Sequence, residues 1–542
     1  MQLHDDLKHR YAREFAEIRD IYTTLYPDRQ LNFVYYEGED PMFGHPVVVE
    51  GDFIFQPSHT SAEYLGREAL PAPFTGALSL TVLIAVPRAP NPGEWQSTEP
   101  DWMPRSRKVA ALFSASPLGY EWLRYKAEMR RKSKAHQRHE WRCLPRGRGA
   151  RELLEYPASI VTDPDAQAAA RPAILIGVHW LEVGGAENMA RDTITWALEA
   201  GLRVFVVAGV PALQRMADRL PDHPDLRFIR LDRYLQAQDW PRHLANLATR
   251  ENIRLVHIHH CVPLYNAIAH LRMMHPDIKV IDTTHIVEHG DGGYPRISGV
   301  WSNYIDMHHV ISRELVDFYR DHFHTLDRAR LGRMLTRSDT AAVLPEPNLT
   351  PDPKALHIAI VGRLVYQKRP VVIVECLRAL AKWAKAKNIT LSVTWVGEGP
   401  MSGAVDTLLR RYGLSETVVR KPAGTDVPAL FESADILLLP SNNEGLALVC
   451  YEAIAHGTIP ISSNVGSQSE IVPDDLLLPL DPVQAVKACV GAVDKLCHDP
   501  AFLARQGDAM RARYSAIMAD PTAKELLMPI YQTVAAGAAP EF

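Results

Sequence analysis

Apolar and polar positions alternate in a regular way from residue 173 onward. Short runs rich in Val, Ile and Leu are separated by longer stretches whose apolar residues recur at helical spacing. This order predicts βαβ units, in which parallel strands form a sheet and helices cover its faces. The expected strands are residues 173–178, 203–208, 226–231, 255–258, 279–283 and 307–311. They predict one Rossmann-like domain within residues 169–350.

A proline-rich interruption divides this pattern. Residues 344–353 contain four prolines, and behind them the alternation starts again. Because proline ends regular elements, we place a domain boundary here and expect a second Rossmann-like domain at residues 351–520. Its expected strands are residues 356–361, 391–396, 417–420, 436–439 and 459–462. Ligands of such sheets lie beyond the carboxyl ends of the strands, so the loops after strands are the candidate sites.

Residues 1–168 follow a different pattern and predict an N-terminal α+β extension. Helices are expected at residues 3–26 and 121–138. The β-rich runs are residues 33–36, 47–55 and 78–86, and residues 157–172, rich in Pro, Ala and Asp, predict a linker. The fold class expected for the chain is therefore α/β, with two doubly wound domains behind an α+β extension.

The charge of the chain is unevenly distributed. Of the 542 residues, 46% are apolar and 23% charged, and the formal net charge is −5, so bulk charge predicts neither a nucleic-acid nor a membrane partner. Residues 105–151, however, carry 14 Lys or Arg against three Glu. Clustered cations beside Trp122, Tyr125 and Trp141 suit an anionic membrane, an acidic polymer or a nucleic acid. A solvated helix packed against the acidic remainder of the protein explains the segment equally well.

Two further features indicate a cytoplasmic protein. The six cysteines form no CxxC pair, as expected where thiols stay reduced. The first residues lack the basic and then apolar order of a secretory signal, and no apolar run approaches the ~20 residues of a membrane span. Any contact with the inner face of a membrane is expected to be peripheral.

Loops at predicted strand ends carry the candidate chemistry. Gly184 and Gly185 follow the first strand, where a glycine pair lets a phosphate or sugar approach a helix N-terminus. A tight βα turn would explain that pair as well. Arg363 and Lys368 follow the first strand of the second domain and can reach a diphosphate, the former as a bidentate fork and the latter as a mobile charge. A solvated basic loop is the alternative.

A third loop is more specific. Glu444 and Glu452 are eight residues apart around an expected helix start, so both carboxylates can border one groove and accept hydrogen bonds from sugar hydroxyls. The amides of Leu446 and Ala447 at this helix start can hold phosphate.

Taken in order, these motifs resemble one enzyme family. They are GGAE after the first strand, GRL…QK opening the second domain, VGEGP at 396–400, SADILLLPS at 433–441, EGLALVCYEA at 444–453 and IPISSNVGSQSE at 459–470. In order and spacing they are similar to the retaining GT-B glycosyltransferases of glycosyltransferase family 4, over residues 173–535. Two positions depart from the family pattern. Residues 466–470 read GSQSE where paired glycine is usual, and Ala447 stands where glycine or proline is frequent.

The resemblance implies a role for each matching residue. Arg363 and Lys368 match the pair that grips the donor diphosphate. Glu444 matches the residue near the hydroxyls of the transferred sugar, and Glu452 matches the glutamate that binds the nucleotide ribose. His285 stands where this family places a histidine near the reacting sugar.

Further positions complete the site that the resemblance implies. Gly184 and Gly185 match the loop that faces the diphosphate and the acceptor, and Glu470 matches a family glutamate of less certain role. The expected catalytic residues are His285, Arg363, Lys368 and Glu444. The expected donor-binding residues are Gly184, Gly185, Arg363, Lys368, Glu444, Gly445, Leu446, Ala447, Glu452 and Glu470.

The resemblance also implies an activity of the hexosyltransferase type. A sugar would pass from a uridine or guanosine diphosphate donor to an acceptor hydroxyl with its anomeric configuration retained. Neither a metal nor a cofactor is expected, since the nucleotide sugar is the substrate. The nearest DxD sequence, Asp163-Pro164-Asp165, lies in the predicted linker rather than after a strand. As in family members, residues 521–542 are expected to form a helix that crosses back to the first domain.

Histidines crowd one part of the chain, with nine of 23 between residues 257 and 309. His285, Glu288 and His289 match the HxxEH pattern of zinc peptidases. We reject a zinc site because this run follows a strand directly and reaches Gly290 within one turn, which leaves no metal-binding helix. Apart from His285, these histidines are expected to be hydrogen-bonded structural residues. Residues 397–403 also fail the dinucleotide fingerprint, since the third glycine is one place late.

Two alternatives to a glycosyltransferase remain open. One is a glycan-binding or scaffolding protein that kept the fold without catalysis. The other is a different GT-B enzyme, such as a nucleotide-sugar epimerase or a phosphorylase. The acceptor is equally open, because a lipid-linked glycan, a polysaccharide, a protein or a modified nucleic acid all present hydroxyls.

Overall fold

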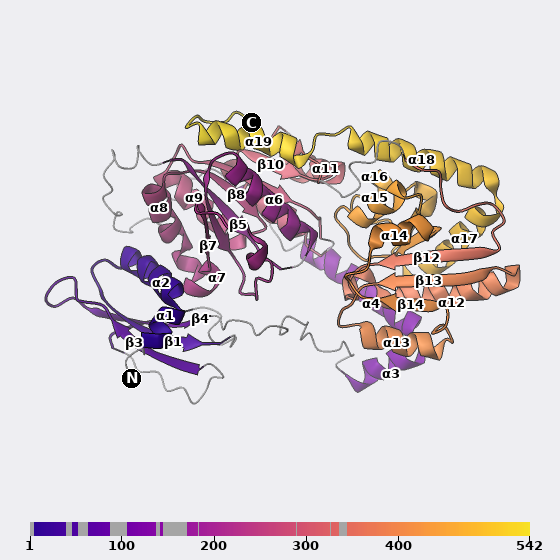
Figure 1. The fold of residues 1–542 in the computed structure, drawn as a ribbon, viewed down its shortest axis with the longest axis horizontal. Coiled ribbons are helices and arrows are strands. Elements are labelled where there is room, and N and C mark those ends of the chain that lie inside the picture. The colour runs from indigo at the N-terminus through magenta and orange to yellow at the C-terminus, as the bar shows by residue number, and fades with distance from the viewer. Residues whose placement is uncertain are drawn as a thin grey trace.

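The computed structural model describes residues 5–38, 46–52, 63–86, 106–136, 141–144, 171–182, 184–288, 290–325, 327–334 and 344–542. Two parallel sheets flanked by helices dominate it, and a smaller mixed sheet lies beside the first of them (Figure 1). The α/β fold class expected from the sequence is confirmed. The expected DxD sequence and most of the expected linker lie outside the described residues.

The first parallel sheet has seven strands in the order β11-β10-β9-β8-β5-β6-β7. Strand β5 lies inside the sheet between β8 and β6, and all six of its residues are buried, so its apolar side chains face both covered sides of the sheet. The strands are β5 (Ala173–Val178), β6 (Arg203–Ala208), β7 (Leu226–Ile229), β8 (Ile253–His259), β9 (Lys279–Thr284), β10 (Met307–Val310) and β11 (Ala329–Leu331). The helices are α6 (Gly185–Glu199), α7 (Leu231–Tyr234), α8 (Trp240–Glu251), α9 (Val262–Met274), α10 (Gly293–Val300) and α11 (Arg313–Phe323).

The second parallel sheet has six strands in the order β14-β13-β12-β15-β16-β17 and a core of its own. Its strands are β12 (Ala355–Val361), β13 (Thr390–Val396), β14 (Val418–Lys421), β15 (Ile436–Leu439), β16 (Ile459–Ser463) and β17 (Leu477–Leu478). Its helices are α12 (Pro370–Lys387), α13 (Ser402–Arg411), α14 (Val427–Ser433), α15 (Leu448–Ala455), α16 (Gln468–Ile471), α17 (Pro482–His498) and α18 (Pro500–Met518). Short 3₁₀ turns are Ala217–Arg219, Ala237–Asp239, Ser302–Tyr304, Tyr366–Lys368 and Asp474–Leu476.

The last helix joins the two parallel-sheet domains. Helix α18 runs along the second domain, and α19 (Ala523–Ala535) continues onto the first (Figure 1). Leu527 and Tyr531 of α19 are fully buried in the first-domain core, and the Tyr531 hydroxyl lies 2.7 Å from Nδ1 of His257. A capping box between Thr522 and Glu525 begins α19 at the point where the chain changes domain.

A four-stranded mixed sheet at the N-terminus packs against the first domain, in the order β2-β4-β1-β3. Its elements are α1 (Asp5–Arg10), α2 (Ala12–Leu25), β1 (Gln30–Glu37), β2 (Val47–Glu50), β3 (Glu63–Ala69) and β4 (Ser79–Val86). The side chains of α2 and this sheet share one core cluster with α8 and α9. Arg250 of α8 also holds Asp20 of α2 through two hydrogen bonds of 2.8 and 2.9 Å.

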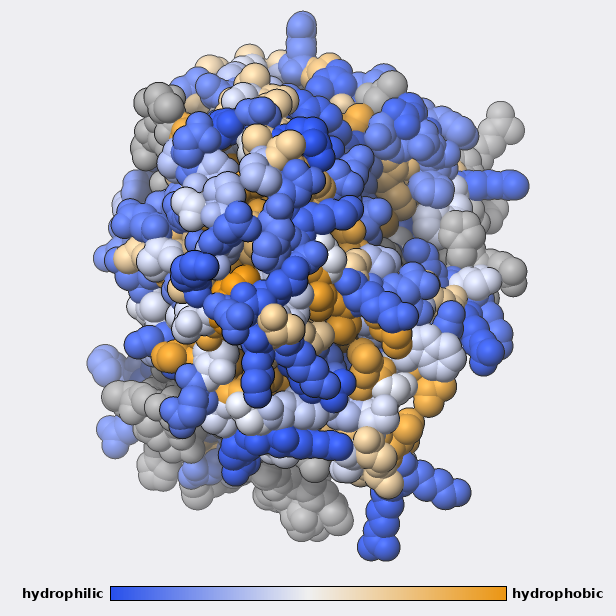
Figure 2. All heavy atoms as spheres, turned by 90° about the vertical axis from the view of Figure 1, so that its right-hand side faces the viewer, coloured by the Kyte–Doolittle hydropathy of each residue, from blue (hydrophilic) through white to orange (hydrophobic). Residues whose placement is uncertain are grey.

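Helices α3 (Arg107–Ala115) and α4 (Pro117–His136) leave this sheet and pack on the second domain (Figure 1). Helix α4 contains much of the basic segment and contacts α12 and α17. Its Arg124 lies over the ring of Tyr366, and its Glu128 accepts a hydrogen bond of 3.2 Å from the amide of Asn442. This agrees with a helix packed against the remainder of the protein, because one side of α4 is an interface with the second domain while residues 130–134 are exposed. Figure 2 shows that this end of the molecule is largely hydrophilic, with apolar side chains visible between the charged ones.

Glu121, in the first turns of α4, predicts a pH-dependent stability. Its side chain is 3% exposed, and burial raises its pKa from 4.5 to about 7 although the Arg124 and Arg369 guanidinium groups oppose this. Because the folded state holds the proton more tightly, stability is complete below pH ~4.5 and is lost as the pH rises through ~7. Gln cannot ionise, so we expect Glu121→Gln to match the wild type at pH 4.5 and to exceed it by up to about 3 kcal/mol at pH 8.

Thermal unfolding from pH 4.5 to 8 measures this difference. The matched control is Glu432→Gln, because Glu432 is exposed in the same half of the molecule. A difference in melting temperature between Glu121→Gln and wild type that is the same at both ends of the pH range would contradict the burial argument.

Candidate active site

The second-domain half of the site is built on the loop after β12. Lys368 ends a short 3₁₀ turn, and its ammonium pairs with the carboxylate of Glu444. The next residue, Arg369, is buried and donates a hydrogen bond of 2.8 Å to the carbonyl of Leu480. Arg369 thereby anchors the loop that carries Lys368 to the protein. Arg363 in the same loop is exposed, and its side chain has no hydrogen-bond or ionic partner among the described residues.

The loop after β15 carries Glu444, the ionic partner of Lys368. The Asn442 amide donates a 2.7 Å hydrogen bond to the carbonyl of Gln367, and the Gln367 side chain donates one of 2.8 Å to the carbonyl of Asn443. These bonds fasten the two loops together and bring Glu444 to Lys368. The carboxylate of Glu444 is only 8% exposed, so its charge is balanced chiefly by that ammonium.

Helix α15 starts directly behind Glu444 and Gly445. It begins at Leu448, and its N-cap residue Ala447 offers no side-chain hydrogen bond. The amides of Leu448 and Cys450 donate to the carbonyls of Leu446 and Ala447, which leaves those of Leu446 and Ala447 for a ligand or solvent. Glu452 lies half-buried in the second turn of the same helix. The predicted residues Leu446, Ala447 and Glu452 therefore share one helix end with the Lys368–Glu444 pair.

The first-domain half of the site is a pocket of about 250 Å³ at the carboxyl ends of β5, β8 and β9. Its lining side chains are rich in histidine and carry two carboxylates. The titratable or aromatic ones are His179, Trp180, Glu187, His259, His260, His285, Glu288 and Tyr294. Gly184 and Gly185 begin α6 at the edge of this pocket, and Glu187 in the first turn accepts a 2.7 Å hydrogen bond from Trp180.

Three buried histidine rings with lowered pKa values line this pocket. Burial lowers the pKa of His285 to about 3, and it lowers the pKa values of His259 and His260 far below their usual range. His285 is 6% exposed, and neither of its ring nitrogens has a hydrogen-bond partner among the described residues. An uncharged ring of this kind can accept a hydrogen bond from a hydroxyl, or donate one, without repelling an adjacent cationic centre.

His260 is held in an unusual backbone conformation. Its φ of +56° is left-handed for a non-glycine residue, and its ring stacks on Tyr294 with centroids 4.2 Å apart and planes within 4°. The Tyr294 hydroxyl lies 3.0 Å from Nδ1 of His179, which fixes both rings. Strained residues of this kind cluster at ligand sites, where the surrounding structure holds them in place.

The two halves meet at Gly445. A Cβ atom on this residue would overlap the carbonyl oxygen of His285, so glycine is needed for the close approach. Leu446 packs against the cores of both domains. The structure thus brings Gly445 of the second domain against the backbone of His285 of the first, and Glu444, the partner of Lys368, directly precedes Gly445.

Glu470 contacts another part of the first domain. Its carboxylate accepts hydrogen bonds of 3.2 and 2.9 Å from the backbone amides of Arg313 and Glu314, at the start of α11. Burial raises the pKa of Glu470. In this position the carboxylate stabilises the positive end of α11 and ties the two domains together.

The other clustered histidines are largely structural, as the sequence analysis expected. His308 lies 2.8 Å from the Asp282 carboxylate, His309 bonds Thr283 and the carbonyl of Gly332, and His257 bonds Thr283 and Tyr531. Residues 285–288 form no helix, and His289, the second histidine of the HxxEH pattern, lies outside the described residues. Within the described part of the chain, no three His, Cys, Asp or Glu side chains gather as metal ligands.

Several side chains of the first-domain pocket carry no motif in the sequence. They are His179, Glu187 and Tyr294, together with His259 and His260, for which the sequence predicts structural roles. His259 does bond Thr193 at 3.0 Å through Nε2, but its Nδ1 has no partner among the described atoms. Their position in the sequence does indicate a site for two of them. His179 and His260 each directly follow a strand that ends at this edge of the sheet, where ligands of such sheets bind.

Comparison with known proteins places this site in a family. Residues 183–344 match the family model described as Glycosyltransferase Family 4, and residues 346–513 match Glycosyl transferases group 1. The chain is 34% identical over 128 residues to a D-inositol 3-phosphate glycosyltransferase of Paenarthrobacter aurescens, covering 22% of this chain and 30% of that protein. It is 26% identical over 264 residues to a human phosphatidylinositol N-acetylglucosaminyltransferase subunit, covering 46% of this chain and 51% of that protein.

The match to these curated relatives spans about a third to a half of their length. Among solved structures, a glycosyltransferase from Rickettsia africae superposes with a TM-score of 0.49 at 15% identity, covering 67% of this chain and 99% of that one. The two family models lie in sequence order on the two parallel-sheet domains and together cover more than half of the chain. The chain therefore belongs to the GT-B glycosyltransferases of family 4, also described as glycosyl transferases group 1.

Proposed function

We propose that this protein is a retaining glycosyltransferase that moves a sugar from a nucleoside diphosphate donor to an acceptor hydroxyl. The observation that carries the proposal is the meeting of the two half-sites, in which Gly445, the residue after Glu444 of the Lys368–Glu444 pair, lies against the backbone of His285. A cation and a helix start belong to one half, and neutral imidazoles belong to the other. The cation and helix start suit a diphosphate, while the imidazoles suit the hydroxyls of a sugar.

Most of the candidate residues in the second domain contribute to donor binding. Lys368 and Arg363 hold the diphosphate, together with the amides of Leu446 and Ala447 at the start of α15. Glu452 binds the ribose of a uridine or guanosine nucleotide. Glu444 accepts hydrogen bonds from the transferred sugar once Lys368 turns to the phosphate. We assign Glu470 to the contact between the domains.

The reaction is a substitution at the anomeric carbon. The bond from this carbon to the diphosphate oxygen breaks, and a bond to the acceptor oxygen forms on the same face. The acceptor proton passes to an oxygen of the leaving diphosphate. Negative charge grows on the diphosphate and positive charge on the sugar, so a fixed ammonium and helix amides lower the barrier. Gly184 and Gly185 border the space between diphosphate and acceptor, and His285 orients the sugar without adding charge.

A panel of nucleotide sugars tests this proposal. The protein is incubated with UDP-glucose, UDP-N-acetylglucosamine, UDP-galactose and GDP-mannose, with and without hydroxyl acceptors that include myo-inositol and D-inositol 3-phosphate. We expect nucleotide release that increases with acceptor, a product of retained configuration, and no loss on adding EDTA. Binding without turnover would indicate a glycan-binding protein, and a changed sugar on an intact nucleotide would indicate an epimerase.

A peripheral membrane contact is a second proposal, supported by the exposed cations at the end of α4. Arg130, Arg131 and Lys134 are exposed, and their side chains have no ionic partner among the described residues. Each cation near an anionic surface contributes about 1 kcal/mol, so neutralising all three should weaken binding about 100-fold. Among the described residues, no helix combines the length and apolar content that a membrane crossing requires.

Sedimentation with vesicles measures this contact. The triple variant Arg130→Gln/Arg131→Gln/Lys134→Gln is expected to stay in the supernatant with phosphatidylcholine vesicles that contain phosphatidylglycerol, whereas the wild type pellets. The control changes the same charge on the exposed Lys382, Lys385 and Lys487 of α12 and α17. Equal pelleting of the wild type and the α4 variant would remove the proposal.

A further inference from the structure

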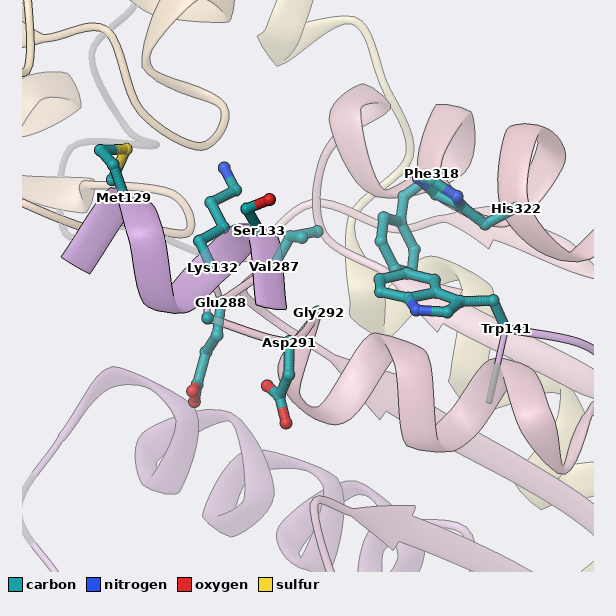
Figure 3. A pocket seen from close by; sticks show the side chains of 11 residues that line it. Met129, Lys132, Ser133, Trp141, Val287, Glu288, Asp291, Gly292, Phe318 and His322 are labelled. Atoms are coloured by element: carbon teal, nitrogen blue, oxygen red, sulfur yellow. The ribbon is translucent and has the colours of Figure 1, made fainter. Parts of the chain in front are cut away.

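A second, larger pocket lies beside the histidine-lined one. Its volume is about 530 Å³, within the range of small-molecule sites. Met129, Lys132 and Ser133 of α4 form one wall, and Trp141 and the first domain form the other (Figure 3). Helix α4 and Trp141 lie outside residues 183–513, which the two family models cover. One side of this pocket is therefore supplied by the N-terminal extension.

Two glycines shape the first-domain wall. Gly292 and Gly293 both have left-handed backbone conformations, with φ of +86° and +60°. A Cβ on Gly292 would lie 2.9 Å from the ring of Trp141, and a Cβ on Gly293 would lie 2.8 Å from Cγ of Glu288. The turn is closed by a 2.9 Å hydrogen bond from the Gly292 amide to the Glu288 carbonyl. Any side chain at these positions would displace Trp141 or Glu288, so the turn is built to place both.

The lining groups suit a sugar ring. Trp141 packs against Phe318 and His322, with centroid distances of 6.1 and 5.0 Å, and these rings form an aromatic wall (Figure 3). The negative face of an aromatic ring attracts the weakly positive C–H groups of a pyranose. Across from it, Ser133 and the Glu288 carboxylate can bond hydroxyls. Glu288 is exposed and has no hydrogen-bond partner among the described residues.

Charge disfavours an anionic occupant. Two carboxylates, Glu288 and Asp291, line the pocket against one ammonium, Lys132. Asp291 accepts a 3.1 Å hydrogen bond from the Gly293 amide and lies 3.5 Å from Arg296, so Glu288 is the carboxylate open to a ligand. A neutral polyhydroxyl ring can donate hydrogen bonds to Glu288, whereas a phosphate would be repelled by it.

The two pockets are adjacent. Glu288 lines both of them and stands three residues after His285. We propose that the larger pocket binds a neutral sugar ring of the acceptor, stacked on Trp141 and hydrogen-bonded to Glu288, so that a neighbouring hydroxyl reaches the His285 pocket. This rests on the proposed glycosyl transfer. It makes the N-terminal extension part of acceptor recognition.

Saturation-transfer NMR on the full chain tests the proposal without needing turnover. The probes are methyl α-glucopyranoside, the methyl glycoside of N-acetylglucosamine, myo-inositol and dodecyl phosphate. We expect at least one neutral ring to bind the wild type, and Trp141→Ala and the isosteric Glu288→Gln each to weaken it about tenfold, as for one lost contact. The control Trp122→Ala, an exposed tryptophan of α4 outside the pocket, should bind as the wild type does. Donor-only nucleotide release should be unchanged in Trp141→Ala.

The outcomes separate this proposal from the proposed function. If no neutral ring binds while nucleotide sugars are turned over, the pocket proposal is wrong and the glycosyltransferase stands. If a ring binds and Trp141→Ala and Glu288→Gln each weaken its binding about tenfold, but no donor is consumed, the sugar pocket stands and the proposed activity falls. Competition by dodecyl phosphate alone would overturn the neutral-ring assignment. Glu288→Gln preserves the size of the side chain. If Trp141→Ala does not fold, the effect of Glu288→Gln on ring binding tests the pocket proposal instead.

Discussion

Replacing Lys368 by alanine is expected to lower kcat/KM for the nucleotide sugar by about 10²–10³-fold, the usual effect of removing one group that stabilises developing charge. The ammonium is 21% exposed at the carboxyl end of β12, where it can reach the leaving diphosphate. Its removal also leaves the Glu444 carboxylate, 8% exposed, without its ionic partner. That second effect should cost about 1–3 kcal/mol of stability.

Steady-state kinetics and thermal unfolding together separate these two effects. The matched control is Lys385→Ala, which removes an exposed lysine from α12 of the same domain. Combining Lys368→Ala with Glu444→Gln should restore stability but not activity, because the buried charge is gone while the diphosphate remains unbound. Glu452→Ala should lower turnover sharply as well, with the fold intact. Full activity in both Lys368→Ala and Glu452→Ala would show that the site is assigned wrongly.

Gly445→Val is expected to reduce turnover by about 100-fold, the scale of loss for a displacement of ~1 Å in a reacting pair. Any Cβ at this position overlaps the carbonyl oxygen of His285, so the two domains must move apart. Gly445 is absent from the residues with positive φ, so valine introduces no left-handed backbone strain within the second domain. We therefore expect melting temperature and nucleotide affinity to change little while chemistry is lost.

Equilibrium binding of uridine and guanosine diphosphates, measured beside turnover, tests this separation. Gly424→Val is the control, because a Cβ there meets nothing within 4 Å and the residue has no positive φ. A Gly445→Val enzyme with wild-type turnover would mean that catalysis does not need the contact between Gly445 and His285. Loss of nucleotide binding would place the damage within the second domain instead.

The strands were the most predictable part of this fold. All eleven strands predicted after residue 173 occur, and β5, β6 and β15 have the predicted bounds. Strands such as β5 and β15 are buried throughout and so appear as continuous apolar runs. The edge strands β11 and β17 were missed, because three and two residues are too short to show a period. In the extension, β3 and α3 were missed as well, and the predicted helix at 3–26 is broken into α1 and α2 at Tyr11.

The basic segment shows what composition alone cannot predict about a helix. Its charge was evident from composition, yet composition does not say which face of α4 is covered. The structure shows that Glu121, Arg124 and Glu128 turn to the second domain, while the cations at the end of the helix stay exposed. A segment that begins in the N-terminal extension thus becomes a wall of a pocket more than 140 residues away in sequence.

By itself, the sequence determined the two parallel sheets and the loops that carry chemistry. Strand burial and helix starts are local properties, readable from apolar runs and from glycine or charge at strand ends. Only the tertiary structure decided which loops meet: Gly445 against His285, Glu470 at the start of α11, and Trp141 across from α4. These contacts join residues far apart in the chain. They depend on how the domains pack, which no local pattern of hydrophobicity specifies.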